Sequence, residues 1–274
     1  MKWGVIGTGN MGSVLIDAWL TSGVIEQEDL WIHNRTLSKA FDIADHYPSI
    51  HVSTTAENVI KQTDVIYICV KPLQVIPLLK QIHKYLRPEQ CIVSITSPIS
   101  VEELNELVPC QTARIIPSIT NRALQGATLL TFPEDIQETM KAYLIQSCKL
   151  FSVPVEIDEP ITRVSSDIVS CGPAFFSYLI QSFIQGANDY ANLDKEKGMI
   201  FAEQMIVGFG KLIEEGHYSL RSLQEKVTVK GGVTGEGLKV LEKEVGDLFH
   251  QVFQATHDKY YLDRDKVEKQ IPNG

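Results

Sequence analysis

The stretch that decides the fold is Met1-Lys2-Trp3-Gly4-Val5-Ile6-Gly7-Thr8-Gly9-Asn10-Met11-Gly12. It reads as a short apolar strand that runs directly into G-x-G-x-x-G, with a helical pattern over residues 11–21 behind it. In such a junction Gly7 makes the tight turn, Gly9 lets the backbone approach a pyrophosphate, and Gly12 lets the helix pack close to the strand. Glycines also gather in ordinary turns, but this position at the first strand-to-helix junction favours a dinucleotide site over Gly7, Thr8, Gly9, Asn10, Met11 and Gly12.

Composition places the chain among ordinary globular proteins. It has 274 residues, of which 44% are hydrophobic, and a net charge of −9. This negative charge disfavours binding to nucleic acid or to anionic membranes. Its five cysteines are scattered without C-x-x-C spacing, which indicates free thiols in a reducing cytoplasm. The histidines show no metal-binding spacing, and the most apolar helical stretch is interrupted by Gly172-Pro173, so neither a metal site nor a membrane span is expected.

The first half of the chain alternates strand-like and helix-like segments. Apolar strands joined by crossover helices predict a mostly parallel sheet covered on both faces. The expected strands are 3–6, 30–33, 65–70, 91–95, 113–116, 126–132 and 151–157. Ser100 followed by Glu103 is a capping-box signal for a helix over residues 101–108. The sequence therefore predicts an α/β Rossmann domain over residues 1–160.

The hydrophobic pattern changes near Ile161, because only helix-like segments follow and no strand-like ones. They cover residues 170–190, 194–215, 219–226 and 234–261, and the polar segment 263–274 is expected to be loose. Long apolar helices in a segment of about 110 residues cannot easily bury their own surface. We therefore expect an all-α domain over residues 161–274 that also forms a homodimer interface, with higher assemblies as a further option.

The end of the second strand bears on which dinucleotide is bound. An NAD-binding fold usually places an acidic residue there, whereas this strand runs into Asn34-Arg35-Thr36. A guanidinium pairs well with a 2′-phosphate, and Thr36 adds a hydroxyl. This favours NADP(H), with NAD(H) as the alternative if Arg35 is only a solvated turn residue.

Three further strand ends should lie along the crevice that binds the dinucleotide, because ligands bind beyond the carboxyl ends of such strands. They are Val70-Lys71-Pro72, Thr96-Ser97-Pro98 and the segment that ends at Ser118. Lys71 is either a proton donor or a structural residue beside the cofactor. The other two are either crevice walls or ordinary turns.

A second glycine cluster lies far along the chain, at Val229-Lys230-Gly231-Gly232-Val233-Thr234. A glycine turn followed by a long helix offers free N–H groups and a helix dipole to a carboxylate, with the Thr234 hydroxyl beside them. The alternative is a flexible turn between helices, capped by Thr234.

Together these motifs resemble those of the pyrroline-5-carboxylate reductase family along nearly the whole chain. The matching marks are residues 7–12, Asn34-Arg35-Thr36, Val70-Lys71-Pro72, Cys171-Gly172-Pro173-Ala174-Phe175, Gly231-Gly232-Val233-Thr234 and Leu241-Glu242. The resemblance implies a Rossmann domain, an interlocking helical dimer, and NADPH-dependent reduction of a cyclic imine, Δ1-pyrroline-5-carboxylate, to L-proline. It also implies that the substrate carboxylate is bound by the backbone of Gly231, Gly232 and Val233, and the ring nitrogen by Thr234.

The chain departs from the family pattern in three loops expected around the substrate. Ser118-Ile119-Thr120 stands where the family usually has Asn-Thr-Pro, Val169-Ser170-Cys171 stands for Ser-Gly-Ser, and Val229-Lys230 stands for Ser-Pro. Loss of one donor to an ionic ligand typically costs about 1.5–3 kcal/mol, which Lys230 offsets or redirects to another anion. The pattern is similar to divergent competence-locus paralogues of the ComER type.

Three functions therefore stay open. The first is reduction of pyrroline-5-carboxylate. The second is a regulatory role that keeps NADP(H) binding without proline synthesis. The third is reduction of another small acid, either a different cyclic imine or a hydroxy acid, and for the hydroxy acid Lys211 is the candidate proton donor.

Overall fold

A computed structural model describes residues 1–271 and divides the chain into two compact units. The first unit contains residues 1–173 and the returning segment from residue 255 onward. The second contains residues 174–254. The chain thus leaves the first unit, builds the second, and comes back.

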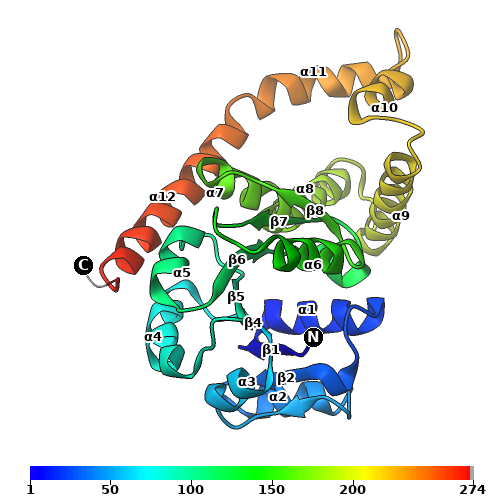
Figure 1. Ribbon diagram of the computed structural model, residues 1–274. Helices are drawn as coiled ribbons and strands as arrows, with labels where there is room; N and C mark the ends of the chain where they lie inside the picture. The colour runs from blue at the N-terminus through cyan, green and yellow to red at the C-terminus, as the bar shows by residue number, and fades with distance from the viewer. Residues whose placement is uncertain (272–274) are drawn as a thin grey trace. The chain divides into compact units, whose positions relative to one another are not determined.

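The first unit is built on one eight-stranded sheet in the order β3-β2-β1-β4-β5-β6-β7-β8 (Figure 1). All neighbouring strands are parallel except β6 and β7, which are antiparallel. The strands are β1 Trp3–Ile6, β2 Leu30–His33, β3 His51–Val52, β4 Val65–Ile68, β5 Cys91–Ser94, β6 Gln111–Ile116, β7 Ala127–Thr131 and β8 Val153–Glu156. The predicted α/β fold with a mostly parallel sheet is confirmed.

Helices cover both faces of this sheet, and alternate strand residues point to opposite faces. Trp3 and Val5 of β1 enter one hydrophobic core, and Ile6 enters the other. The helices are α1 Asn10–Ser22, α2 Ser38–Ala44, α3 Ala56–Gln62, α4 Pro72–Ile82, α5 Val101–Leu107, α6 Glu138–Lys149 and α7 Thr162–Ser166. The predicted capping box on α5 is confirmed, since Ser100 Oγ accepts the N–H of Glu103 and Glu103 accepts that of Ser100.

The second unit contains helices and no strand over residues 174–254, all of which are described. Its elements are the greater part of α8 Gly172–Ala191, then α9 Lys195–Glu214, α10 Leu220–Val227, α11 Val233–Val245 and the start of α12 Leu248–Glu268. The single helix predicted over residues 234–261 is wrong. It is divided at Gly246, whose φ of 34° and ψ of −112° take the backbone out of the helical region.

The expectation of a loose segment over residues 263–274 is also wrong where the structure describes it. Helix α12 continues to Glu268, and its Val267 is fully buried in the core that contains residues of α4 and α5. Arg264 of α12 donates to the Glu103 carboxylate at 2.6 Å and to the carbonyl oxygen of Pro98 at 3.1 Å. Residues 272–274 lie outside the described part.

Candidate functional site

The strand order reverses between β1 and β4, and this is the place where parallel α/β sheets bind nucleotides. Beyond β1 lie residues 7–12, beyond β2 lie residues 34–36, and beyond β4 and β5 lie residues 70–72 and Ser97. Because β1, β2, β4 and β5 are parallel, the predicted cofactor residues all lie beyond the carboxyl ends of strands at the same end of the sheet. Their direct contact with a cofactor stays a prediction.

The three glycines of the fingerprint have different surroundings. Gly7 adopts φ +106°, and a Cβ there would lie 2.5 Å from the carbonyl oxygen of Cys69. A Cβ on Gly12 would lie 2.1 Å from the carbonyl oxygen of Gly7, so the helix packs against the turn through hydrogen alone. A Cβ on Gly9 would have no heavy atom within 4 Å. Gly9 thus leaves open space in front of the helix, while Gly7 and Gly12 allow the turn itself.

The start of α1 suits an anionic ligand. Its N-cap is Gly9, so no side chain caps the first N–H groups, and its first turn carries no acidic residue. Those N–H groups and the helix dipole favour a phosphate. The buried Thr8 Oγ1 has no hydrogen-bond partner within residues 1–271. An orphaned hydroxyl beside an uncapped helix fits the pyrophosphate of a dinucleotide.

Beyond β2, the three polar residues divide into two roles. Asn34 Oδ1 accepts the N–H of Thr8 at 3.1 Å, and its Nδ2 donates to the carbonyl oxygen of Thr36 at 2.9 Å. Asn34 therefore fixes the glycine turn relative to the end of β2. Arg35 and Thr36 are exposed, which leaves both side chains available to a 2′-phosphate.

Lys71 lies at the N-cap of α4, and Pro72 occupies the first turn, where a missing N–H costs nothing. The Lys71 side chain is exposed and Val70 is half-buried. The carbonyl oxygen of Lys71 accepts the N–H of Gln74 at 2.8 Å, so its backbone has a structural role at the start of the helix.

Ser97 and Ser118 are both buried and both hydrogen-bonded. Ser97 Oγ accepts from Arg163 Nη1 at 3.1 Å. Ser118 Oγ donates to the carbonyl oxygen of Val169 at 2.8 Å and accepts the N–H of Thr120 at 3.3 Å. Ser118, 1% exposed, therefore connects the end of β6 to the π-helical turn Asp167–Cys171. Its predicted contact with substrate would require this hydroxyl to exchange partners.

The predicted substrate loop lies in the second unit, before and at the start of α11. Val229, Lys230, Gly231, Val233 and Thr234 are exposed, and the N-cap of α11 is Gly232, without a side-chain cap. The N–H of Gly232 donates to the carbonyl oxygen of Val229 at 2.8 Å and closes the turn. Thr234 lies inside the first turn, so it is not the helix cap. Uncapped N–H groups at the start of α11 remain suited to a carboxylate.

Lys211, the candidate proton donor for a hydroxy acid, is exposed on α9 and pairs with Glu214 at 3.0 Å and Glu215 at 3.7 Å. Its hydrogen bond with Glu214 and the charges of both acids raise the Lys211 pKa. A more tightly held proton makes Lys211 a weaker acid, which argues against reduction of a hydroxy acid through this residue.

Sequence reasoning missed a buried polar cluster beside Ser97. Asp167 is fully buried and accepts from Arg163 Nη2 at 2.7 Å and from Thr256 Oγ1 at 2.8 Å. Arg163 and Asp167 are four residues apart on a helical pattern, which is the spacing of neighbours on a helix face. The sequence thus indicated that Arg163 and Asp167 could form an ion pair, but the spacing alone does not distinguish a buried ion pair from an exposed one.

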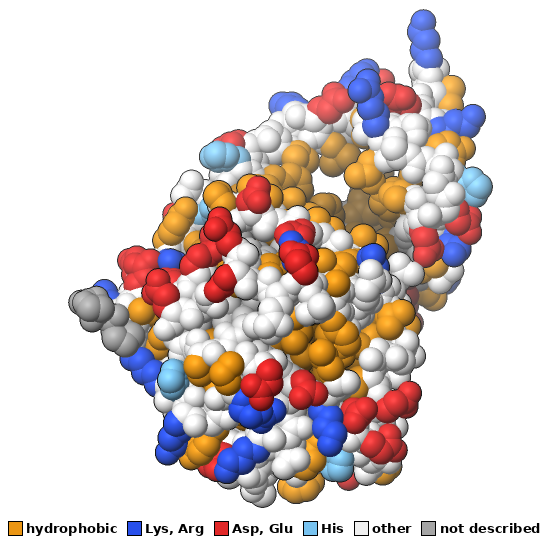
Figure 2. Space-filling view, viewed as in Figure 1, with side chains coloured by type: hydrophobic (Ala, Val, Ile, Leu, Met, Phe, Trp, Pro, Cys, Tyr) orange, Lys and Arg blue, Asp and Glu red, His pale blue; other side chains and the backbone are white. Residues whose placement is uncertain are grey.

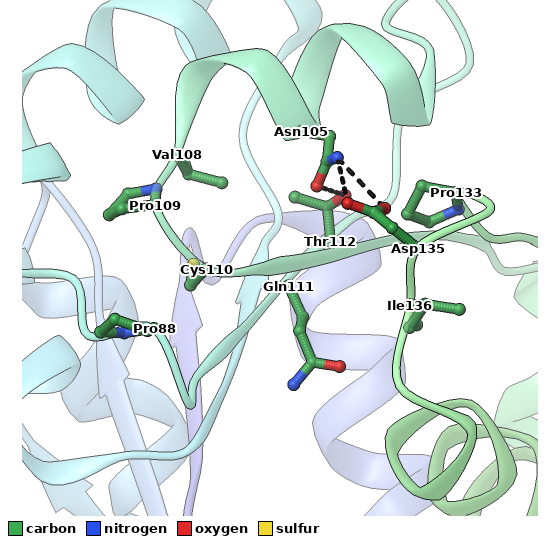
Figure 3. Close-up of a pocket in the computed structure, with 10 residues that line it drawn as sticks. All are labelled: Pro88, Asn105, Val108, Pro109, Cys110, Gln111, Thr112, Pro133, Asp135 and Ile136. Carbon is green, nitrogen blue, oxygen red and sulfur yellow. Dashed lines mark hydrogen bonds between the residues drawn. The ribbon is translucent and has the colours of Figure 1, made fainter.

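A pocket of about 350 Å³ lies at the opposite edge of the sheet, where β5 and β6 begin (Figure 3). Asn105 Nδ2 donates to both carboxylate oxygens of Asp135 across it, at 3.2 and 3.1 Å. None of the predicted site residues lines this pocket, so it is not the predicted cofactor or substrate site. Within residues 1–271 no cluster of metal-ligating side chains occurs, and no helix is long and apolar enough to cross a membrane.

Comparisons with known proteins identify the family of the chain. Residues 2–98 match the family described as NADP oxidoreductase coenzyme F420-dependent, and residues 159–261 match pyrroline-5-carboxylate reductase dimerisation. "ComE operon protein 4" of Bacillus subtilis is 50% identical over 99% of both chains. "Pyrroline-5-carboxylate reductase 3" of the same organism is 31% identical over 97% of this chain and 98% of its own.

Solved structures show the same fold. A Plasmodium falciparum pyrroline carboxylate reductase with NADP bound is 21% identical, with a TM-score of 0.80 over 99% of this chain and 98% of its own. A pyrroline-5-carboxylate reductase from Coxiella burnetii is 21% identical, also with a TM-score of 0.80, over 99% of both chains. With a glycine fingerprint at the switch point, a helical second unit and a full-length relative above 30% identity, the chain belongs to the pyrroline-5-carboxylate reductase family.

Proposed function

We propose that the chain is an NADPH-dependent reductase of a small cyclic imino acid, Δ1-pyrroline-5-carboxylate, which it converts to L-proline. The observation that carries the proposal is the uncapped start of α1 beside the orphaned Thr8 hydroxyl, in a chain of this family. NADPH supplies a hydride when bound. The chain's own part is to bind and orient, because hydride transfer to a protonated imine needs position and charge more than a strong base.

Each residue group has a separate task in this proposal. The N–H groups at the start of α1 and Thr8 Oγ1 bind the pyrophosphate, and Arg35 with Thr36 holds the 2′-phosphate. In the second unit, the N–H groups at the start of α11 hold the substrate carboxylate, and the Thr234 hydroxyl hydrogen-bonds the ring nitrogen. The Gly232 N–H is engaged with Val229, so Val233 and Thr234 are the better-placed N–H donors.

Assembly as a homodimer is part of the proposal. Over residues 174–254, Ala202 is the one buried hydrophobic side chain, whereas Phe183, Phe201 and Val207 are 72%, 62% and 67% exposed. Figure 2 shows hydrophobic side chains gathered over the helices of this unit. So many exposed large hydrophobic side chains on one unit are typical of an interaction site. The dimerisation family that residues 159–261 match indicates that the partner is a second copy of the chain.

The test is NADPH oxidation, followed by absorbance, with pyrroline-5-carboxylate as the acceptor and folded, cofactor-bound dimer. Turnover with formation of proline supports the proposal. Absence of turnover by protein that binds NADPH refutes it.

A second candidate is a regulatory protein that binds NADP(H) without making proline. The observation that favours it is the position of the sequence departures. Val229, Lys230 and Cys171 all lie in predicted substrate loops, while residues 7–12 and 34–36 are intact. The 50% identical relative is named for its operon and not for a reaction. Calorimetric binding of NADP(H) without turnover supports this candidate, and turnover at rates typical of reductases contradicts it.

A further inference from the structure

The turn after β5 contains a serine whose hydrogen-bonding direction is fixed by its neighbour. Ser97 is 8% exposed, and its Oγ accepts a hydrogen bond from Arg163 Nη1 at 3.1 Å. A guanidinium has no acceptor, so Arg163 can only donate to this oxygen. The hydroxyl proton of Ser97 is therefore left to donate elsewhere. Within residues 1–271, Ser97 Oγ takes part in this hydrogen bond only as an acceptor and donates none.

Arg163 is itself held in place by a buried carboxylate. The Arg163 side chain is 15% exposed, and its Nη2 donates to Asp167 Oδ1 at 2.7 Å, while Asp167 is fully buried. Asp167 Oδ2 accepts from Thr256 Oγ1 at 2.8 Å, and His257 Nε2 lies 3.7 Å from the same oxygen. Both nitrogens of the guanidinium fork are thus used, one for Asp167 and one for Ser97. This fixes the position of the nitrogen that donates to Ser97.

The place of Ser97 in the sheet indicates what it contacts. The phosphates belong at the start of α1 and the 2′-phosphate at the end of β2, on one side of the switch point. The ends of β4 and β5 lie on the other side, where the nicotinamide half must extend. The carboxamide is the hydrogen-bonding group of the nicotinamide ring, and its carbonyl oxygen is a neutral acceptor. A donor that is itself hydrogen-bonded to a cation makes a stronger hydrogen bond than an isolated hydroxyl.

We infer that Ser97 donates a hydrogen bond to the carboxamide oxygen of the nicotinamide, and that Arg163 is the positioning residue that orients and polarises this hydroxyl. The inference rests on the proposed function, because it requires NADP(H) in the crevice. It adds a contact that fixes the ring orientation, which the glycine fingerprint and Arg35 do not provide.

The test measures affinity, so it does not depend on which imine is reduced. NADP⁺, its thionicotinamide analogue and 2′,5′-ADP are titrated calorimetrically into wild type, Ser97→Ala, Arg163→Lys and the double variant. Arg163→Lys keeps a charge for Asp167 but lacks the second nitrogen that reaches Ser97. Ser152→Ala is the matched control, because its hydroxyl donates to the carbonyl oxygen of Cys148 near the end of α6.

We expect Ser97→Ala to weaken NADP⁺ binding by about three- to tenfold, the effect of one lost hydrogen bond, and to leave 2′,5′-ADP unchanged. The thio analogue should lose less, since sulfur is a weak acceptor. Arg163→Lys should produce a similar selective loss, and it should add little in the Ser97→Ala background because the two residues act as one unit. Ser152→Ala should change none of the three affinities.

Several results would overturn the inference while the proposed function survives. They are unchanged NADP⁺ affinity in Ser97→Ala, an equal loss for 2′,5′-ADP, an equal loss for the thio analogue, or additive effects of the two variants. Failure of wild type to bind both NADP⁺ and 2′,5′-ADP would refute the proposed function together with this contact.

Discussion

Two single substitutions in the glycine fingerprint should have different effects: Gly12→Ala should lower the stability of the fold, and Gly9→Ala should lower the affinity for NADPH. A Cβ on Gly12 would lie 2.1 Å from the backbone oxygen of Gly7, over 1 Å closer than a normal carbon–oxygen contact of about 3.3 Å. Because the obstacle is backbone, α1 must move away from the turn. Overpacking of this kind costs about 3 kcal/mol, and alanine regains about 1 kcal/mol as a better helix former. Gly12→Ala should therefore destabilise the fold by about 2 kcal/mol.

Gly9→Ala should behave in the opposite way. Gly9 has φ −79° and ψ −164°, which alanine adopts without strain, and no heavy atom lies within 4 Å of its Cβ position. The poorer N-cap costs about 0.5–1 kcal/mol. The added methyl group occupies the space in front of the helix start, so NADPH affinity should fall by more than about tenfold, or 1.4 kcal/mol.

The measurements are urea unfolding followed by tryptophan fluorescence and titration with NADPH, on both variants and wild type. The three tryptophans are Trp3, Trp19 and Trp31, all in the first unit, so fluorescence reports on the fold that contains the site. Wild-type NADPH affinity in Gly9→Ala, or equal destabilisation by the two variants, would refute the reasoning.

Four further predictions follow from individual contacts. Arg35→Ala should weaken NADPH binding by about tenfold and leave NADH binding unchanged in parallel titrations, because the proposed role of this exposed side chain is to bind the 2′-phosphate alone; equal losses would contradict it. Asp167→Leu should lower the unfolding free energy in urea by about 3–5 kcal/mol because it leaves Arg163 unpaired in a buried cluster, and a loss below about 1 kcal/mol would show that the pair is dispensable. Burial raises the pKa of the Cys148 thiol from 9.0 to about 12, so the folded chain keeps this thiol protonated at pH values where the unfolded chain ionises it. The contribution of Cys148 to the free energy of unfolding is therefore complete below pH 9, and it falls by up to about 1.4 kcal/mol per pH unit toward pH 12. Cys148→Ala should make this decline shallower in urea unfolding. Phe201→Asp should convert the dimer to monomer in light scattering after gel filtration, whereas a wild-type monomer would remove the basis of this prediction.

The fold could largely be predicted because its signals are local. Trp3–Ile6 and Leu30–His33 have the predicted bounds, and the capping box at Ser100 and Glu103 forms within four residues. The break at Gly246 is local, but two other features that were missed depend on distant contacts. His51–Val52 is a two-residue edge strand, too short to show alternation, and it exists because it pairs with β2. The polar end of α12 is stabilised by Glu103 and Pro98, more than 160 positions away in sequence.

The candidate site divides in the same way. Glycine spacing and strand ends placed residues 7–12 and 34–36 at one edge of the sheet. The commitment of Asn34 to the glycine turn and of Ser118 to the π-helical turn was not predictable, because hydrogen-bond partners 26 and 51 residues away are set by tertiary packing. The same holds for Ser97 and Arg163, whose sequence separation is 66 residues.

The return of α12 to the first unit has a consequence for synthesis on the ribosome. Val267 completes a core whose other buried residues are all made before residue 111, so that core lacks Val267 until residues 174–254 have been made. A nascent chain released before residue 255 would therefore expose apolar surface of the nucleotide-binding unit to chaperones and proteases, although the whole glycine fingerprint and every strand had already been made.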